Sequence, residues 1–413
     1  MYLRFWMGKL DGLRLRLWRF AVQHVGSLLF TGVLLLAVTG VVAWHERGKG
    51  HLHQLQTQLQ LQPKPVESTP AAQPGEKDPV VLQRAVLTGS TTPEFTSVTL
   101  LPGRGMQVLQ IRASLPDRGE VDLLDAPGLQ DAASQLNGKG DDADGSGSLR
   151  MGAALEAPWA GVLGSHPTLW QGHPLGDDRS DGGLLLMAKA DDLSTSVMPD
   201  GGDAQATFNL KNFNGHWVSD TELTTQVLLS ARVIDLTISA KNTGTEPEPI
   251  GLGWRPRFAV SQGDRASLRL RLPGGEVIEQ RGGHPTGEAS PLGANWQDRQ
   301  GSPIAAEGLR MTLTHLQHGF LDTGPMVELR NAAAGYGLRM KLLTSSIQTL
   351  KIDAPADGRS ITIAPQYNLD EPFGRQWNRG PESGMVVLQP GESTRWKVRL
   401  EIFPLESTAP ALP

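Results

Sequence analysis

The chain has 413 residues, enough for one large domain with appendages or for two ordinary domains. Its formal net charge of −5 includes no long basic block, which argues against a nucleic-acid partner, and the absence of cysteine excludes disulfides, thiolate metal sites and a cysteine nucleophile. Glycine (48 residues) and proline (29 residues) are frequent, as expected for many short strands joined by tight turns.

An apolar segment near the N-terminus is the first predicted element. Residues 25–44 carry no formal charge and have about the length that a helix needs to cross ~30 Å of hydrocarbon. Basic residues predominate before this segment and are few after it, so the positive-inside rule predicts a cytoplasmic N-terminus (1–24). We therefore expect a single-pass inner-membrane protein with a periplasmic C-terminal domain. A cleaved signal peptide is the alternative, although its apolar core is normally only ~7–15 residues long.

A linker is predicted to follow at 45–78. Leucines spaced by three and four residues within 51–62 suit a short amphipathic helix. The prolines of 63–78, together with Ser, Thr, Gln and Gly, indicate an extended chain that cannot pack a core. The folded domain is therefore expected to cover 79–407, followed by a tail at 408–413.

Strand-like runs recur throughout this domain. They lie at 80–87, 97–102, 106–115, 225–230, 233–242, 267–272, 337–343, 360–365, 385–390 and 393–403. Apolar and polar residues alternate within 233–240, which is typical of a strand with one buried face. Most connections are too short for crossover helices, so we expect antiparallel pairing and an all-β fold.

Two glycine-containing segments interrupt the strands. Gly103-Arg104-Gly105 is too short to cradle nucleotide phosphates and is interpreted as a turn between strands. Residues 130–149 are polar and glycine-rich, which predicts a mobile surface loop. The acidic residues of this loop lack the ligand spacing of a calcium-binding helix–loop–helix, and we expect neither a metal site nor a cofactor.

Four blocks, in the same order as in a known family, carry a resemblance. They are Phe95–Pro127, Asn214–Trp217 with the strand pair that ends in Gly253-Trp254-Arg255-Pro256-Arg257-Phe258, Ser360–Gly374, and Leu388–Ile402. Together they resemble the aldose 1-epimerase (galactose mutarotase-like) family over roughly residues 79–407. The resemblance implies a large antiparallel β-sandwich with a sugar-binding cleft on one concave face.

The resemblance also implies a catalytic base and acid at two positions that this chain fills differently. The family places its base, a Glu, in an I-E-P segment, where this chain has Ala364, and its acid, a His, in a G-W-H-P-Y-F segment, where this chain has Arg255. A methyl group cannot accept a proton, and a guanidinium with a pKa above ~12 is a poor donor at neutral pH. The family's arginine near 157–164 and second histidine near 186–189 also have no counterpart. We therefore expect a catalytically inactive member.

Several residues remain candidates for the site. A relocated acid–base pair would have to come from Asp370 and Glu371, or from His166, His173, His216, His315 and His318, although Asp370-Glu371-Pro372 also resembles a turn and loop histidines are usually solvated. The sugar-binding candidates are Trp254, Arg255, Gln366, His216 and Trp217. A tryptophan face can stack on a sugar ring, but a tryptophan in a sandwich is more often part of the core.

Three functions are compatible with these features. The first is a non-catalytic carbohydrate-binding protein on the periplasmic side of the membrane. The second is an active mutarotase, or a related sugar isomerase, with relocated acid and base. The third is a structural subunit that docks another envelope protein.

Overall fold

The computed structural model describes residues 72–405, except for 86–89, 165–167, 177–180, 262, 321, 357 and 379–381. The predicted cytoplasmic segment, the predicted membrane helix, nearly all of the linker and the tail lie outside these residues. Among the described residues, no helix is long and apolar enough to cross a membrane.

An eleven-stranded sheet forms one layer of this region. Its order is β1 (Val80–Gln83), β2 (Glu94–Leu101), β3 (Gln107–Leu115), β5 (Ala153–Glu156), β13 (Gly253–Ala259), β22 (Ser360–Gln366), β21 (Thr349–Pro355), β18 (Gly308–Gln317), β15 (Gly274–Arg281) and β16 (His284–Pro291), with β4 (Gly119–Asp122) beside β3. All of its strand pairs are antiparallel.

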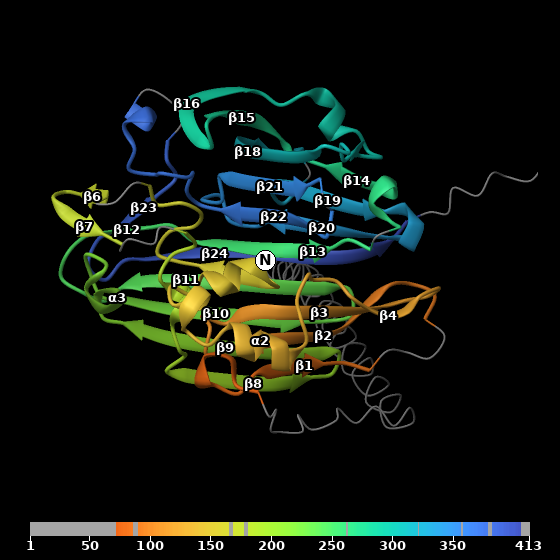
Figure 1. Cartoon of the computed structure of the whole chain (residues 1–413), viewed down its shortest axis with the longest axis horizontal. Helices are drawn as coiled ribbons and strands as arrows, with labels where there is room; N and C mark the ends of the chain where they lie inside the picture. Colours follow the sequence, from red (N-terminus) through yellow and green to blue (C-terminus); the bar gives the residue numbers. More distant parts are fainter. Residues whose placement is uncertain are drawn as a thin grey trace, which may run out of the picture. The chain divides into compact units, whose positions relative to one another are not determined.

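A nine-stranded antiparallel sheet forms the second layer. Its order is β17 (Ser302–Pro303), β14 (Leu268–Arg271), β19 (Met326–Asn331), β20 (Tyr336–Leu342), β24 (Ser393–Pro404), β11 (Val233–Asn242), β10 (Thr221–Leu229), β9 (Gly201–Leu210) and β8 (Asp192–Met198). In Figure 1 both sheets follow the same course, from β16 and β14 at the top to β1 and β8 at the bottom. The prediction of an antiparallel β-sandwich is therefore confirmed.

Small elements complete the described region. Two-stranded sheets pair β12 (Glu248–Ile250) with β23 (Val386–Leu388) and β6 (Thr168–Trp170) with β7 (His173–Leu175). The helical elements are η1 (Pro74–Glu76), α2 (Leu129–Gln135), η2 (Gly140–Asp142), η3 (Ser146–Arg150), η4 (Leu185–Met187), α3 (Asn212–Gly215), η5 (Arg265–Ser267), η6 (Ala294–Gln297), η7 (Ala332–Ala334) and η8 (Arg375–Asn378).

The core lies between the two sheets. Residues alternate along β10 between buried and half-buried, because successive side chains of a strand point to opposite faces of the sheet. Trp254 of β13 and Trp396 of β24 are almost fully buried and belong to one hydrophobic cluster that contains residues of both sheets. Burial of apolar surface, at roughly 25 cal/mol per Å², therefore holds the layers together.

The predicted turn between β2 and β3 is confirmed, and its sequence has a steric reason. Gly105 has a φ of 61°, and a Cβ at this position would lie 2.4 Å from the carbonyl oxygen of Leu185. Only glycine fits both the left-handed backbone and this close approach. The turn therefore holds Arg104, the residue before Gly105, in one fixed orientation.

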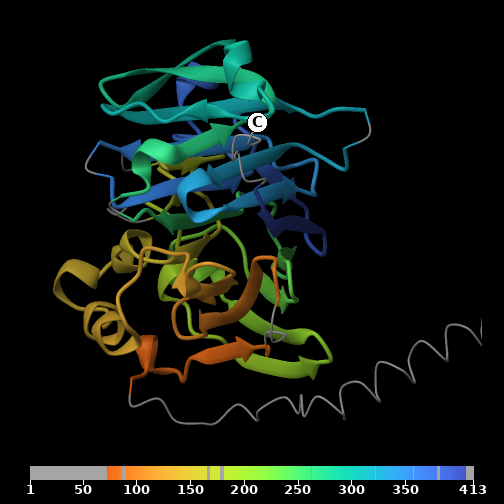
Figure 2. The same ribbon diagram turned by 90° about the vertical axis from the view of Figure 1, so that its right-hand side faces the viewer.

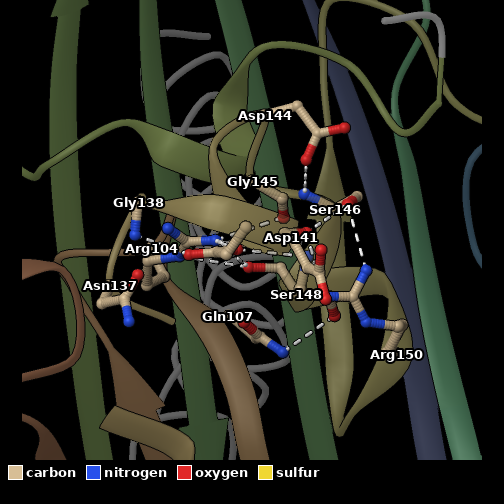
Figure 3. Close-up of polar contacts among 12 residues, drawn as sticks. Arg104, Gln107, Asn137, Gly138, Asp141, Asp144, Gly145, Ser146, Ser148 and Arg150 are labelled. Atoms are coloured by element: carbon tan, nitrogen blue, oxygen red, sulfur yellow. Dashed lines mark hydrogen bonds and ion pairs between the residues drawn. The ribbon is translucent and has the colours of Figure 1, made fainter. Parts of the chain in front are cut away.

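The prediction of a mobile loop at 130–149 is wrong. Figure 2 shows α2 and the helical turns after it, in gold, beside the orange strands β2 and β3. Arg104 reaches into this segment with its guanidinium almost fully buried, and its Nη2 donates to Asp142 Oδ1 at 2.7 Å and to the carbonyl of Gly145 at 3.2 Å. Nε of the same guanidinium donates to Ser148 Oγ at 3.2 Å (Figure 3).

Backbone groups of the segment complete this cluster. Asp142 accepts hydrogen bonds from the amides of Gly138 and Gly147, at 2.7 and 3.1 Å. Gln107 donates to the carbonyls of Ser148 and Met151, at 3.0 and 2.7 Å. A segment with few apolar residues is therefore ordered by one buried ion pair and the hydrogen bonds around it.

Removal of Asp142 should unfold this segment. In Asp142→Ala the guanidinium of Arg104 would be buried without its counterion, and breaking a buried pair in this way typically costs about 3–5 kcal/mol. Denaturant unfolding of the two proteins should show a loss of that order. Asp141→Ala is the matched control, because the neighbouring aspartate is exposed, and equal midpoints for the wild type and both variants would contradict this account.

A second buried polar cluster lies beside the turn after β11. The side chain of Asn242 donates to the carbonyls of Glu246 and Leu388 and accepts from Ser219 Oγ and the amide of Gly244. Asn242 is fully buried, so all of these bonds replace bonds to water. The sequence Asn242-Thr243-Gly244 thus has a structural role in this turn.

Glu248 is buried in the same region with a raised pKa. One carboxylate oxygen accepts from Thr221 Oγ1 at 2.8 Å, and the other has no partner in the part of the chain that the structure describes. Burial, reinforced by the nearby charge of Asp220, raises the pKa of Glu248 to about 7 from 4.5.

This group should make the fold less stable as the pH rises from 4.5 to 7. In that interval the folded chain keeps a proton that the unfolded chain releases, so stability falls with increasing pH, by about 3 kcal/mol in total. Glu248→Gln should remove this contribution, and Glu246→Gln, which changes an exposed residue of the same turn, should not. Denaturant unfolding at several pH values measures the slope; an unaltered slope in Glu248→Gln would refute the assignment.

Candidate functional site

A cavity of about 240 Å³ lies over the middle strands of the eleven-stranded sheet. The register of β13 and β22 places Arg255 opposite Ala364, and Ala364 pairs with Lys351 of β21 on its other side. The cavity is lined by Leu149, Arg255, Arg257, Gln280, Gly283, Arg310, Met311, Thr312, Lys351, Ile352, Asp353, Thr362, Ala364 and Asp370. The two positions that the sequence singled out, Arg255 and Ala364, are thus neighbours in one cavity.

Arg255 forms an ion pair with a buried glutamate. Its Nε lies 2.8 Å from Oε1 of Glu156, the last residue of β5, whose carboxylate is fully buried. The other oxygen of Glu156 accepts the amide of Gly161 at 3.2 Å. Burial raises the pKa of Glu156, and the positive charge of Arg255 opposes that shift.

Asp370 lines the cavity but its carboxylate is already bound. Lys351 Nζ donates to both of its oxygens at 2.8 Å, and the amide of Val162 donates to Oδ1 at 2.9 Å. Both carboxylate oxygens are therefore occupied by protein donors. The main effect of Asp370 here is to hold the ammonium group of Lys351 beside Ala364.

Glu371 lies outside the lining of this cavity. Its carboxylate contacts a ring nitrogen of His284 and accepts from Gln376 Nε2 at 3.2 Å. The hydrogen bond and charge of Glu371 raise the pKa of the exposed His284. None of the described histidines lines the cavity over Ala364, and His166 lies outside the described residues.

The two predicted tryptophans are packed inside the sandwich. Trp254 is 1% exposed, and Trp217 is 3% exposed and stacks on Trp159 with ring centroids 5.4 Å apart. Both belong to the main hydrophobic cluster. These positions favour the packing role that the sequence had left as the alternative to sugar stacking.

Gln366 and His216 lie away from the open part of the cavity. Gln366, at the end of β22, is fully buried, and its Nε2 donates to the carbonyl of Asn368. His216 is exposed in a second cavity of about 840 Å³, which shares no lining residue with the first. Of the five predicted sugar-binding residues, therefore, only Arg255 lines the cavity over Ala364.

Several charged residues of the site were missed by sequence reasoning, Arg310 and Asp353 of the lining among them. Lys351, Arg257 and Glu156 become neighbours of Arg255 through strand pairing and ion pairs. Each is a charged residue within a strand of otherwise mostly apolar or small residues. This charge was the sequence feature that could have indicated a place in the site. No group of three or more metal-ligating side chains occurs within the described ranges.

The geometry can be compared with known proteins. A model of the family described as aldose 1-epimerase matches residues 194–401. No curated protein matches the sequence significantly.

Solved structures share the fold at low sequence identity. A galactose mutarotase-like protein from Clostridium acetobutylicum superposes with a TM-score of 0.62 at 15% identity, over 78% of this chain and 98% of that one. A putative aldose 1-epimerase from Escherichia coli K12 gives 0.56 at 18% identity, over 75% and 96%. The GalM/aldose epimerase homologue from Caenorhabditis elegans gives 0.56 at 13% identity, over 75% and 96%. The fold and the match over half of the sequence together show that this chain belongs to the aldose 1-epimerase family.

Proposed function

We propose that this chain binds a carbohydrate in the cavity over Ala364 and does not interconvert its anomers. The observation that carries the proposal is the environment of Ala364, where a methyl group lies between the cations Arg255 and Lys351. Opening of a pyranose ring needs one group that takes the proton of the anomeric hydroxyl and another that protonates the ring oxygen. Neither arginine nor a methyl group does either at neutral pH.

The nearby carboxylates do not supply the missing base. Glu156 is fully buried in its ion pair with Arg255 and does not line the cavity. The oxygens of Asp370 accept hydrogen bonds from Lys351 and from the amide of Val162. A general base must lie within about 2.6–3.2 Å of the proton that it removes. Glu156, which is fully buried in its ion pair, does not meet this condition in the structure.

Binding itself is supported by the polar lining. Gln280, Thr312 and Thr362 offer amide and hydroxyl groups to the cavity, beside the charged residues. Ligand cavities usually measure about 300–1,000 Å³. At about 240 Å³ this cavity is somewhat smaller, which suits a ligand of monosaccharide size.

The proposal includes the location predicted from the sequence. The apolar run at 25–44 and the basic residues before it support a membrane anchor that displays the domain on the periplasmic side. Docking to another envelope protein is the competing role for the displayed domain. Detergent extraction and protease accessibility in intact spheroplasts test the topology.

Isothermal titration against monosaccharides and cell-wall glycans should detect binding. Ligands that bind should lose affinity in Thr362→Val, which removes a lining hydroxyl with little change of volume; one neutral hydrogen bond contributes about 1 kcal/mol, or roughly fivefold. Thr195→Val, on the exposed edge strand β8, is the control. Absence of heat with every sugar would refute carbohydrate binding and leave the docking role.

Mutarotation should be no faster with the protein than in buffer alone. Polarimetry on freshly dissolved α-glucose and α-galactose, at substoichiometric protein, measures this rate directly. An accelerated rate that is lost in Glu156→Gln or in Asp370→Asn would establish a relocated base and overturn the proposal. Glu120→Gln, an exposed residue of β4, is the control for a carboxylate outside the cavity.

A further inference from the structure

The cavity over Ala364 has more cationic side chains than a neutral sugar requires. Its cationic lining residues are Arg255, Arg257, Arg310 and Lys351. Its lining carboxylates are Asp353 and Asp370. The excess of lining cations over lining carboxylates is a feature of the cavity itself, because the whole chain has a net charge of −5.

Arginine donors in the cavity are left without protein partners. Arg255 uses Nε for its ion pair with Glu156, and no described residue accepts a hydrogen bond from its Nη1 or Nη2. Its side chain is 18% exposed and lines the cavity. Arg257 binds Asp125 through Nη2 at 2.8 Å, and its buried Nε has no partner among the described residues.

The carboxylate partners of these cations differ in where they lie. Asp370 lines the cavity and binds Lys351 at 2.8 Å, whereas Asp125, the partner of Arg257, does not line it. Glu156, the ion-pair partner of Arg255, is fully buried and does not line the cavity. The pair of Arg310 and Asp353, at 3.4 Å, is largely exposed, and exposed pairs contribute little. Of the four cations, Arg255 therefore combines a place in the lining with terminal nitrogens that have no described protein partner.

We infer that the cavity binds a saccharide with an anionic group, a carboxylate or a phosphate, which the free edge of the Arg255 guanidinium contacts. The inference rests on the proposed function, because it names the ligand class of the same cavity. A planar guanidinium can donate two parallel hydrogen bonds to either group, and such charge-assisted bonds are roughly twice as strong as neutral ones. Lys351, on the other side of Ala364, is paired with Asp370, so Arg255 is the main cationic contact for the ligand.

Isothermal titration with three ligands tests the ligand class. D-glucose, D-glucuronate and D-glucose 6-phosphate have the same ring and differ in the group at C6. At least one of the two anions should bind about tenfold or more tightly than glucose, and its affinity should fall as NaCl increases. The glucuronate and phosphate arms show which anionic group the cavity selects.

Two variants place the interaction in the cavity. Arg255→Gln combined with Glu156→Gln removes both charges of the buried pair with side chains of similar size, and should reduce anion affinity by about tenfold or more, a larger factor than any loss of glucose affinity. Arg257→Gln is a second, more exposed test, which should also weaken the anion. Arg395→Gln, which changes an exposed arginine of β24 in the other sheet, should have no effect.

The outcomes separate this inference from the proposed function. Equal affinity for glucose and both anions, or binding of glucose alone, overturns the anionic class and leaves carbohydrate binding intact. Anion binding that is unchanged in both cavity variants overturns the site. Circular dichroism and the thermal midpoint verify that the double variant is folded, and failure to fold transfers the test to Arg257→Gln.

Discussion

The pairing of β22 with β13 and β21 determines what the cavity can do. Because facing residues of paired strands point to the same side of a sheet, Ala364 shares its surface with Arg255 and Lys351. A carboxylate at position 364 would have two cationic neighbours and would be held in its charged form. With alanine at that position, Arg255 can contact a ligand there instead of an internal base.

The rest of the fold holds this arrangement in place. Trp254, adjacent to Arg255 in β13, points to the opposite face and is packed in the core, so the strand cannot rotate without exposing an indole. Arg255 is held by its ion pair with Glu156, and Lys351 is held by its ion pair with Asp370. The two cations are therefore ordered before a ligand arrives, which reduces the entropy that binding would otherwise lose.

Sequence reasoning predicted the fold well and the site only in part. Alternation in residues such as those of β11, together with turn signals, was sufficient for an antiparallel sandwich, because period-two burial is a local property. Gln366 and Trp254 were assigned to the site from their motifs, but which face of a strand is covered depends on neighbours distant in the chain. The partners of Arg255, namely Glu156 and Lys351, are about 100 residues away in opposite directions, so their proximity could not be derived from spacing.

The segment at 130–149 illustrates the same limit. Its composition is that of a loop, and the signal for order was Arg104, which precedes it by more than 25 residues. A buried arginine is stable only if hydrogen-bond acceptors surround its guanidinium. Here these acceptors are carbonyl, hydroxyl and carboxylate groups of the segment. Hydrogen bonding thus orders this part of the chain together with the buried apolar contacts of Ala132 and Leu136.

A crystal structure with a bound saccharide is the most direct test of the central claim. The account predicts electron density over Ala364, with the anionic group at the free edge of Arg255 and no carboxylate of the protein within about 3 Å of the anomeric hydroxyl. An oxygen of Glu156 or Asp370 within hydrogen-bond distance of that hydroxyl would contradict the claim, because a base would then be in place.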